Sequence, residues 1–484
     1  MKLGALAAQA GIALAGPGEA QVTGFAIDNR KVAPGTVFGA FQGAVVNGED
    51  FIPAAIAAGA VAVVARPEAT VSGALHIAAD QPRQTFAQLA ACFFAPVPET
   101  VVAITGTNGK TSCVEMTRQI WRMAGHRAAS IGTLGVTTAD ESVSTGLTTP
   151  DIVTFLANMS GLAREGISHV AFEASSHGLS QYRSEGPRVA AGAFTNLSRD
   201  HLDYHNDMDD YFAAKMRLFD EVVDPTGAAV VWMDDEWTAR AVAHVSRRGL
   251  RLLGVGEQAD AQGIRLIART PGQLGQTLEI EFAGQVRKLN LPLIGAYQAA
   301  NALVSAGLVL ATGGDPVQVF DALARLQPVR GRLERAGITR AGAPVYIDYA
   351  HTPDALEAAI AALRPHCSGK LIVVFGAGGD RDPGKRAPMG AVVAQQADHG
   401  IVTDDNPRGE DPAAIRAMVL AGGPSLTEIG DRRAAIAAAI AQAGRDDIVM
   451  VAGKGHEQGQ IIGSGDTCRV LPFDDVTVAR ECAA

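Results

Sequence analysis

The residues of the chain best suited to chemistry form a turn rich in glycine and threonine. Residues 105–111 read Thr-Gly-Thr-Asn-Gly-Lys-Thr and follow the apolar run 101–104. Glycines let backbone N–H groups surround a phosphate, and the N-terminus of a following helix favours anions. In such a loop Lys110 reaches the β- and γ-phosphates, and the hydroxyl of Thr111 holds Mg²⁺. Ile104 stands where the strict phosphate-loop motif has its first glycine. The alternative is therefore an ordinary strand-to-helix turn, but the flanking segments favour nucleotide binding.

A carboxylate and a polar cluster follow later in the chain. Glu173 comes directly after the apolar run 169–172, and the segment 196–205 contains two histidines and two aspartates. A carboxylate at a strand end beside a phosphate loop is a natural Mg²⁺ ligand. The alternatives are a solvated glutamate beside helix-capping serines and a solvated loop. We favour a metal or phosphate site.

The segment 211–219 predicts a helix with an apolar face. Phe212, Leu218 and Phe219 provide that face, and Lys215 lies one turn after Tyr211. From periodicity alone, Lys215 is predicted to be a surface lysine.

Short β-branched runs alternate with longer helical stretches along the chain. The runs 101–104, 169–172, 371–375 and 448–451 predict buried strands, and 111–125 predicts a helix. This alternation is typical of βαβ units, so we expect an α/β fold with mostly parallel sheets. Ligands bind beyond the carboxyl ends of such strands, where the candidate residues stand.

Length and composition restrict the organisation and the partners. A chain of 484 residues predicts about three domains. Pro96 and Pro98 mark one linker and residues 327–331 mark a second break, which gives domains at 1–97, 98–329 and 330–484. The net charge of −10 argues against nucleic acid or an anionic membrane as the main partner.

The cysteines and the N-terminus indicate a cytoplasmic protein. The five cysteines are scattered without a C-x-x-C pair, which suits a reducing compartment. No apolar run reaches the roughly 18 residues that a membrane helix needs. Residues 1–18 are similar to a signal peptide, but Gln9 and several glycines favour a short helix and loop.

The phosphate loop resembles the nucleotide signature of the Mur ligases of peptidoglycan synthesis. Further segments resemble the same family and follow in its order over nearly the whole chain: 148–151, 173–179, 200–205, 211–219, 331–334, 348–354, 378–382, 405–408 and 453–457. Each segment is a weak signal, but the ordered set is specific. The resemblance implies a smaller N-terminal α/β domain for a UDP group, a central P-loop ATPase domain and a C-terminal Rossmann-like domain for an incoming amino acid.

The resemblance also implies an activity and its cofactors. It implies an ATP-dependent amide ligase that adds meso-2,6-diaminopimelate to UDP-N-acetylmuramoyl-L-alanyl-D-glutamate through an acyl phosphate. The expected cofactors are ATP, Mg²⁺ at two sites and a CO₂-derived carbamate on Lys215. In the family the matching lysine carries this carbamate, which can hold a second Mg²⁺ as a free lysine cannot. The expected enzyme is a monomer whose partners are these small molecules.

The site residues are carried over by resemblance. The catalytic set is Lys110, Lys215, Glu173 and His201, and the metal set is Thr111, Glu173, His201 and Lys215 as N6-carboxylysine. The ATP set is Gly106, Thr107, Asn108, Gly109, Lys110, Thr111, Ser112, Asn301, Arg332 and Asp348. The UDP-substrate set is Ile27, Asn29, Thr148, Thr149, Ser175, Gln181 and Arg183. The diaminopimelate set is Arg381, Asp405, Asn406, Pro407, Arg408, Gly453 and Glu457.

The tetrapeptide 405–408 carries the expected amino-acid specificity. Pro407 fixes its backbone, and Arg408 offers a planar fork that pairs with a carboxylate at two points. Diaminopimelate has a second carboxylate that lysine lacks, so bound lysine would leave a buried arginine unpaired. The alternative is a surface turn, since Asn-Pro is a turn dipeptide. In the family this tetrapeptide marks the diaminopimelate-adding members, with Asp405 and Glu457 for the ammonium and Arg381 for the other carboxylate.

The sequence departs from the family pattern at three places. Asn29 replaces a serine, Gln298 replaces an asparagine near the adenine site, and residues 44–46 replace a more polar loop.

Three alternatives remain open: a lysine-adding relative, a folylpolyglutamate synthetase and a non-catalytic P-loop switch. The tetrapeptide 405–408 and the N-terminal domain disfavour the first two, and a switch has no use for Lys215 or Arg408.

Overall fold

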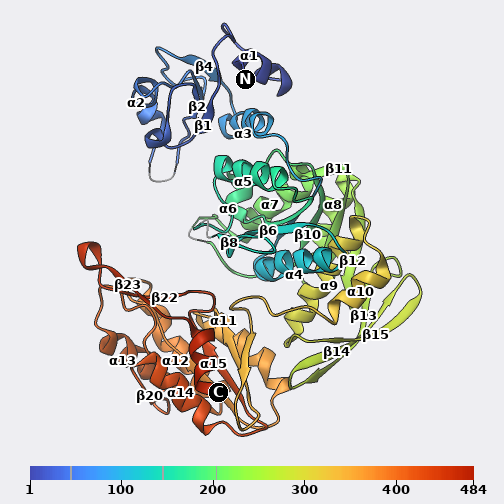
Figure 1. Ribbon diagram of the computed structural model, residues 1–484, viewed down its shortest axis with the longest axis vertical. Helices are drawn as coiled ribbons and strands as arrows, with labels where there is room; N and C mark the ends of the chain where they lie inside the picture. Colours follow the sequence, from blue (N-terminus) through green and yellow to red (C-terminus); the bar gives the residue numbers. More distant parts are fainter. Residues whose placement is uncertain (44–45, 144–145, 203) are drawn as a thin grey trace. The chain divides into compact units, whose positions relative to one another are not determined.

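The computed structural model describes residues 1–43, 46–143, 146–202 and 204–484. Ala44 and Val45 of the N-terminal loop and Asp203 of the segment 200–205 lie outside the described residues. The chain divides into two compact units, Met1–Val255 with Val304–Asp315, and Gly256–Leu303 with Pro316–Ala484. Figure 1 colours them along the chain.

The N-terminal part of the first unit is a four-stranded parallel sheet with helices. Its strands run in the order β1 (Gly24–Ala26), β2 (Thr36–Gly39), β3 (Ala62–Ala65) and β4 (Leu75–Ala78). Its helices are α1 (Leu3–Gln9), α2 (Ile52–Ala57) and α3 (Pro82–Phe93). The short helix expected at the N-terminus is therefore confirmed. Phe86 of α3 is buried, and its ring meets those of Phe25 and Phe41 edge-on.

A larger sheet forms the centre of the first unit, with strand order β12-β11-β10-β5-β9-β6-β7-β8. The strands from β12 to β6 are parallel, and β7 and β8 are antiparallel additions. The strands are β5 (Thr100–Thr105), β6 (Ala128–Gly132), β7 (Gly135–Thr137), β8 (Ser142–Val143), β9 (His169–Glu173), β10 (Val189–Phe194), β11 (Val223–Trp232) and β12 (Arg251–Gly256). The helices are α4 (Lys110–Met123), α5 (Ile152–Arg164), α6 (Ser176–Ser180), α7 (Met208–Arg217), the π-helical turn η3 (Leu218–Val222) and α8 (Thr238–Arg248).

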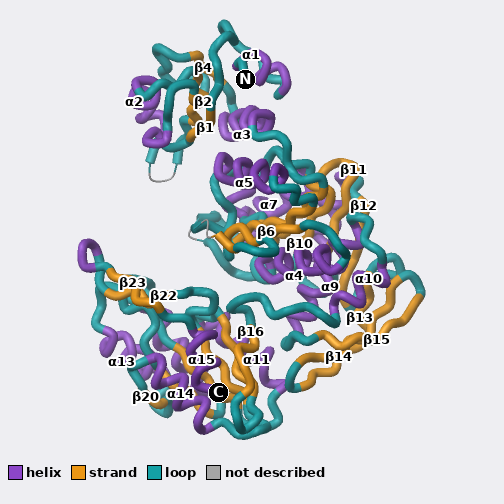
Figure 2. The backbone as a smooth tube through the Cα atoms, in the orientation of Figure 1, coloured by secondary structure: helices purple, strands orange, loops and turns teal. Residues whose placement is uncertain are grey.

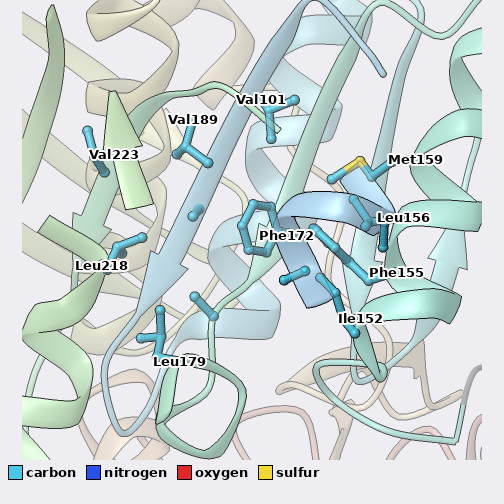
Figure 3. Packing of buried hydrophobic residues seen from close by; sticks show 14 of the residues in the cluster. Val101, Ile152, Phe155, Leu156, Met159, Phe172, Leu179, Val189, Leu218 and Val223 are labelled. Carbon is cyan, nitrogen blue, oxygen red and sulfur yellow. The ribbon is translucent and has the colours of Figure 1, made fainter. Parts of the chain in front are cut away.

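The strands of this sheet are continuous apolar runs because helices cover both faces of the sheet. In Figure 2 the strands β6 and β10 lie between the helices α5 and α4. Parallel strands covered on both faces bury every side chain, and β9 is buried from Val170 to Glu173. Figure 3 shows Phe172 beside Phe155 of α5, and their ring centroids are 5.0 Å apart.

The second unit contains an antiparallel meander and a doubly wound sheet. The meander is β13 (Ile264–Gly272), β14 (Gly275–Phe282) and β15 (Gln285–Leu291). The sheet has the order β16-β17-β21-β18-β19-β20, with β16 (Glu334–Ile338), β17 (Pro344–Asp348), β18 (Leu371–Phe375), β19 (His399–Val402), β20 (Thr427–Glu428) and β21 (Ile448–Ala452). All its pairings are parallel except β16 with β17.

Helices and one hairpin complete the second unit. The helices are α10 (Pro316–Leu323), α11 (Pro353–Leu363), η4 (Arg364–His366), α12 (Arg386–Gln396), α13 (Pro412–Gly422), α14 (Arg432–Gln442) and α15 (Asp475–Ala483), and α9 (Ala296–Ala311) runs through both units. The hairpin is β22 (Gly459–Ile462) with β23 (Arg469–Pro472). Alternate residues of β18 enter two different cores, Leu371 and Val373 in one and Ile372 and Val374 in the other. Two apolar faces are the signature of a doubly wound sheet.

The expected α/β fold is confirmed, and so are the four strands, which are β5, β9, β18 and β21. The helix 111–125 is α4. The surface position that periodicity predicted for Lys215 is wrong, because its side chain is 1% exposed. Within the described residues, the structure contains no helix with the length and apolarity of a membrane span.

The buried position of Phe172 gives a stability prediction. Phe172→Ala leaves a cavity between β9 and α5, and we expect it to lower the free energy of unfolding of the central region by about 3–5 kcal/mol. All three tryptophans, Trp121, Trp232 and Trp237, lie in this region, so their fluorescence during urea unfolding measures the loss. Val143→Ala is the control, since Val143 is 52% exposed and its truncation is expected to cost less than about 0.5 kcal/mol. Equal losses in the two variants would contradict this packing.

Candidate active site

The phosphate loop joins β5 to α4 and is held by the segment that follows β10. Gly106 has a φ of +141°, and a Cβ on it would collide with Oγ1 of Thr195. The backbone N–H of Thr107 donates to Asn196 O at 2.9 Å, and that of Asn108 donates to Asn196 Oδ1 at 2.9 Å. Thr195 Oγ1 donates to Asn108 O at 2.6 Å. The loop conformation is therefore built into the fold.

Two lysines donate to the same carbonyl of this loop. Lys110 Nζ lies 2.9 Å and Lys215 Nζ lies 2.7 Å from Gly106 O. Lys215 comes from α7, and its nitrogen also lies 4.4 Å from the ring centroid of Tyr211. Burial lowers the pKa of Lys215 well below its usual value; the charge of Lys110 lowers it further, and Asp200 opposes the shift. Burial and Lys110 therefore disfavour the charged form of Lys215 relative to a lysine in water.

Glu173 ends β9 next to the phosphate loop. In the sheet register Glu173 pairs with Ile104 of β5, and its side chain is 1% exposed. Its carboxylate accepts from the backbone N–H of Thr133 at 2.7 Å and from Thr133 Oγ1 at 3.3 Å. Thr111, in the first turn of α4, is also buried. The fold thus places a carboxylate and a hydroxyl beside the loop, as the sequence predicted.

Aromatic and imidazole rings gather over the start of α7. The His177 ring centroid lies 5.1 Å from that of His201, 3.9 Å from that of Tyr204 and 5.7 Å from that of His205. The rings of His201 and Tyr211 are 5.9 Å apart, and Tyr211 Oη lies 3.2 Å from Thr107 Oγ1. His201 is therefore near the phosphate loop, as expected. His177 and Tyr211 were not assigned roles from the sequence, although both lie in segments that resemble the family.

The residues expected to hold the muramoyl-dipeptide meet around Thr149. Its hydroxyl donates to Glu173 O at 2.8 Å and accepts from the Ser175 N–H at 3.1 Å. Arg183 donates to Thr149 O at 3.1 Å and to Gln181 Oε1 at 2.6 Å. Thr148 Oγ1 lies 3.1 Å from Thr133 Oγ1. Five residues from two stretches of the chain, 148–149 and 175–183, therefore share one polar cluster. Ile27 and Asn29 are half-buried after β1 in the N-terminal sheet.

The second unit brings together residues expected near the nucleotide base and ribose. Asp348 is buried at the end of β17, where it accepts from the N–H groups of Leu333 and Ala350 at 2.8 and 2.9 Å. Burial raises the pKa of its carboxyl. Gln298 donates to Arg332 O at 2.8 Å and accepts from Asn301 at 3.4 Å. Gln298, which departs from the family pattern, therefore links the other two residues.

The residues expected to bind diaminopimelate follow β18, β19 and β21. Asn406 donates to Glu457 Oε2 at 2.8 Å, and Arg408 donates to Gly379 O at 2.8 Å. Gly453 has a φ of +117°, and a Cβ there would collide with Asp405. Arg381 is exposed in the loop after β18. Pro407 stands between Asn406 and Arg408, whose backbone has a φ of +51°.

One central residue of this second cluster was missed from the sequence. Lys454 is completely buried, and it donates to Asn406 Oδ1 at 2.7 Å. Its only signal in the sequence is its place in the segment 453–457.

Comparisons with known proteins identify the family. Family models match residues 21–100 (Mur ligase family, catalytic domain), 104–309 (Mur ligase middle domain) and 331–455 (Mur ligase, glutamate ligase domain). The UDP-N-acetylmuramoyl-L-alanyl-D-glutamate--2,6-diaminopimelate ligase of Zymomonas mobilis is 63% identical over 95% of this chain and 94% of its own length. The protein of the same name from Bradyrhizobium diazoefficiens is 51% identical over 94% and 93%. The chain belongs to the Mur ligase family.

Solved structures agree in fold. A structure of a UDP-N-acetylmuramoyl-L-alanyl-D-glutamate--2,6-diaminopimelate ligase matches with a TM-score of 0.75 and 30% identity, over 100% of this chain and 98% of that one. A folylpolyglutamate synthase from Mycobacterium tuberculosis matches with a TM-score of 0.60 and 20% identity over 75% of this chain and 89% of that one, so it shares the fold.

The tight fit of Gly106 gives a prediction on nucleotide binding. Gly106→Ala forces a Cβ against Thr195 at a positive φ, a strain of about 1–3 kcal/mol. We expect ATP affinity, measured by calorimetry, to fall about tenfold to a hundredfold. Gly161→Ala is the control, because a Cβ at Gly161 meets nothing within 4 Å. We expect this variant to bind ATP with unchanged affinity. Unchanged affinity in Gly106→Ala would refute the role of this close contact.

Proposed function

We propose that the protein is an ATP-dependent ligase of peptidoglycan precursor synthesis. It joins meso-2,6-diaminopimelate to the D-glutamate carboxylate of UDP-N-acetylmuramoyl-L-alanyl-D-glutamate. Its relatives, identical at up to 63% of positions in the comparisons above, carry this activity in their names. The structural observation that carries the proposal is the convergence of Lys110 and Lys215 on Gly106 O beside Glu173.

The reaction must turn a poor acylating agent into a good one. The substrate carboxylate attacks the γ-phosphorus of ATP, and ADP leaves, which produces an acyl phosphate. The amine of diaminopimelate then attacks the acyl carbon, loses a proton and expels phosphate, which leaves an amide. Carboxylate and γ-phosphate repel each other by about 4 kcal/mol at ~4 Å and an effective dielectric near 20. Lys110 opposes this repulsion, and the rest of the loop positions the nucleotide.

The residues at the loop fit the expected metal ions. The set expected from the resemblance combines a hydroxyl, a carboxylate, an imidazole and a carbamate. That set is Thr111, Glu173, His201 and carbamylated Lys215. Hydroxyl, carboxylate and carbamate oxygens suit Mg²⁺. When bound, two Mg²⁺ ions would neutralise the charge of the phosphates and the carboxylate.

The environment of Lys215 suits the carbamate. An uncharged amine attacks the carbon of CO₂ and loses one proton, which leaves N–COO⁻ on the side chain. Burial and the neighbouring Lys110 both favour the uncharged amine. The product is an anion, which the positive charge of Lys110 attracts, whereas a charged ammonium at Lys215 would be repelled.

The remaining roles follow the two polar clusters. The set around Thr149 holds the muramoyl-dipeptide, with Ile27 and Asn29 at the UDP group. Asn301, Arg332 and Asp348 contact the nucleotide. The loop 405–408, with Arg381, Gly453 and Glu457, holds diaminopimelate, and Arg408 pairs with its distal carboxylate.

The proposal extends to the setting of the enzyme. We place it in the cytoplasm, where ATP and UDP-linked sugars are made and used. We also propose a monomer, since one chain supplies residues for all three substrates.

The substrate requirement tests the proposed function. We expect ATP consumption in a coupled assay only when UDP-N-acetylmuramoyl-L-alanyl-D-glutamate and meso-diaminopimelate are both present. Lysine in place of diaminopimelate offers Arg408 no carboxylate, so kcat/KM is expected to be at least about a hundredfold lower. Equal turnover with lysine would overturn the specificity, and ATP consumption without either substrate would indicate a switch instead of a ligase.

Removal of Lys215 tests its role at the metal site. Lys215→Ala eliminates the amine that carries the carbamate, so we expect kcat to fall at least about a hundredfold. Added bicarbonate is expected to leave the loss unchanged, because no amine remains to be modified. Lys288→Ala, at an exposed lysine of β15, is the control. Full activity of Lys215→Ala would exclude the carbamate.

A further inference from the structure

Lys454 is the buried centre of the second polar cluster. It follows β21, two residues after the strand ends, while Asp405 and Asn406 follow the end of β19. Both strands are parallel members of one sheet, so their carboxyl ends open on the same edge. The side chain of Lys454 is 0% exposed, which is rare for lysine unless its charge is paired.

The ammonium of Lys454 has a partner for each of its three protons. It donates to Asn406 Oδ1 and to Gly459 O, both at 2.7 Å. On its remaining side lie Glu457 Oε2 at 3.5 Å and Asp405 Oδ1 at 3.8 Å. Burial lowers the pKa of Lys454, and Asp405 opposes the shift. The lysine is therefore held by the residues expected to receive the substrate.

These contacts decide which way Asn406 points. Its Oδ1 accepts from Lys454 and from the N–H of Ile461 at 2.9 Å. With two donors at the oxygen, the amide nitrogen must turn to the other side, where it donates to Glu457 Oε2 at 2.8 Å. Lys454 thus fixes both Asn406 and Glu457.

The same lysine attaches the hairpin β22–β23 to the loop 405–408. It binds Gly459 at the start of β22. Two residues further, Ile461 O accepts from the N–H of Arg408 at 3.0 Å, and Arg408 O accepts from Gly463 at 2.7 Å. The backbone of Arg408, which is at a positive φ, is therefore held by a strand that Lys454 anchors.

The charges of Asp405, Glu457 and Lys454 also fit the binding of an ammonium group. Asp405 and Glu457 carry two negative charges and Lys454 one positive charge. The neighbouring Arg432 forms an ion pair with Asp475, in which Nη2 of Arg432 lies 2.6 Å from Oδ2 of Asp475. Asp405, Glu457 and Lys454 together carry one formal negative charge, which matches a single ammonium group of the substrate, while Arg408 and Arg381 supply positive charge for its carboxylates.

We propose that Lys454 is a positioning residue for amino-acid recognition: it orients Asn406 and Glu457 and fixes Arg408 through β22, so that the cluster accepts one ammonium and one carboxylate of diaminopimelate. This inference rests on the proposed function. Lys454 acts through its neighbours and exchanges no proton with the substrate.

The test compares Lys454→Met and Lys454→Gln in the complete enzyme with Lys370→Met, an exposed lysine of the same sheet region. For Lys454→Met we expect the KM for diaminopimelate to rise at least tenfold and the preference for diaminopimelate over lysine to fall by a similar factor. The KM values for ATP and the UDP-substrate stay within twofold. Lys454→Gln keeps an amide NH₂ group that can donate, so its KM for diaminopimelate is expected to lie between those of Lys454→Met and the wild type. Lys370→Met is expected to have the same KM values and the same preference for diaminopimelate as the wild type.

Each other outcome overturns the inference. An unchanged KM for diaminopimelate in Lys454→Met, or a loss of kcat with all three KM values unchanged, would leave Lys454 a purely structural residue. If Lys454→Met does not fold, Lys454→Gln is judged by the same criteria. Failure of the proposed function is distinguishable, because the wild type would then show no turnover with diaminopimelate.

Discussion

The burial of one amine against the phosphate loop constrains the rest of the first unit. Lys215 reaches Gly106 O from a helix 109 residues further along the chain. A buried ammonium beside Lys110 would be costly in free energy, because two cations would share one carbonyl in a medium of low dielectric. An uncharged amine avoids this cost, and the proposed carbamate turns the repulsion into attraction. The side-chain nitrogen of Lys215 therefore affects both the proposed chemistry of the site and its stability.

The parallel sheets supply the framework on which both clusters are built. In each sheet many of the candidate residues stand at or just beyond the carboxyl ends of strands: β5, β9 and β10 in one sheet, and β17, β18, β19 and β21 in the other. Backbone groups take part directly: the N–H of Thr133, just after β6, donates to Glu173, and the carbonyl of Gly459, the first residue of β22, accepts from Lys454. In both clusters the backbone of the strands and turns positions the side chains, and the side chains determine which ligand binds.

Much of this could be predicted from the sequence. Four strands follow from apolar runs, because strands buried on both faces show no alternation, and the phosphate loop follows from its glycines. The burial of Lys215 and Lys454 could not be predicted in this way. Periodicity describes one helix and its own apolar stripe, whereas Lys215 bonds to a loop 109 residues away and Lys454, which follows β21, bonds to Asn406 48 residues away. Only the resemblance to the Mur ligases pointed to Lys215. The same limit applies to Gln298, whose contact with Arg332 O joins residues 34 positions apart.

The state of Lys215 can be measured directly. The protein equilibrated with ¹³C-bicarbonate is expected to show a carbamate carbon resonance by NMR, and this resonance is expected to disappear in Lys215→Met while Lys288→Met retains it. A spectrum of the wild type without such a resonance, or one that Lys215→Met leaves unchanged, would contradict the account.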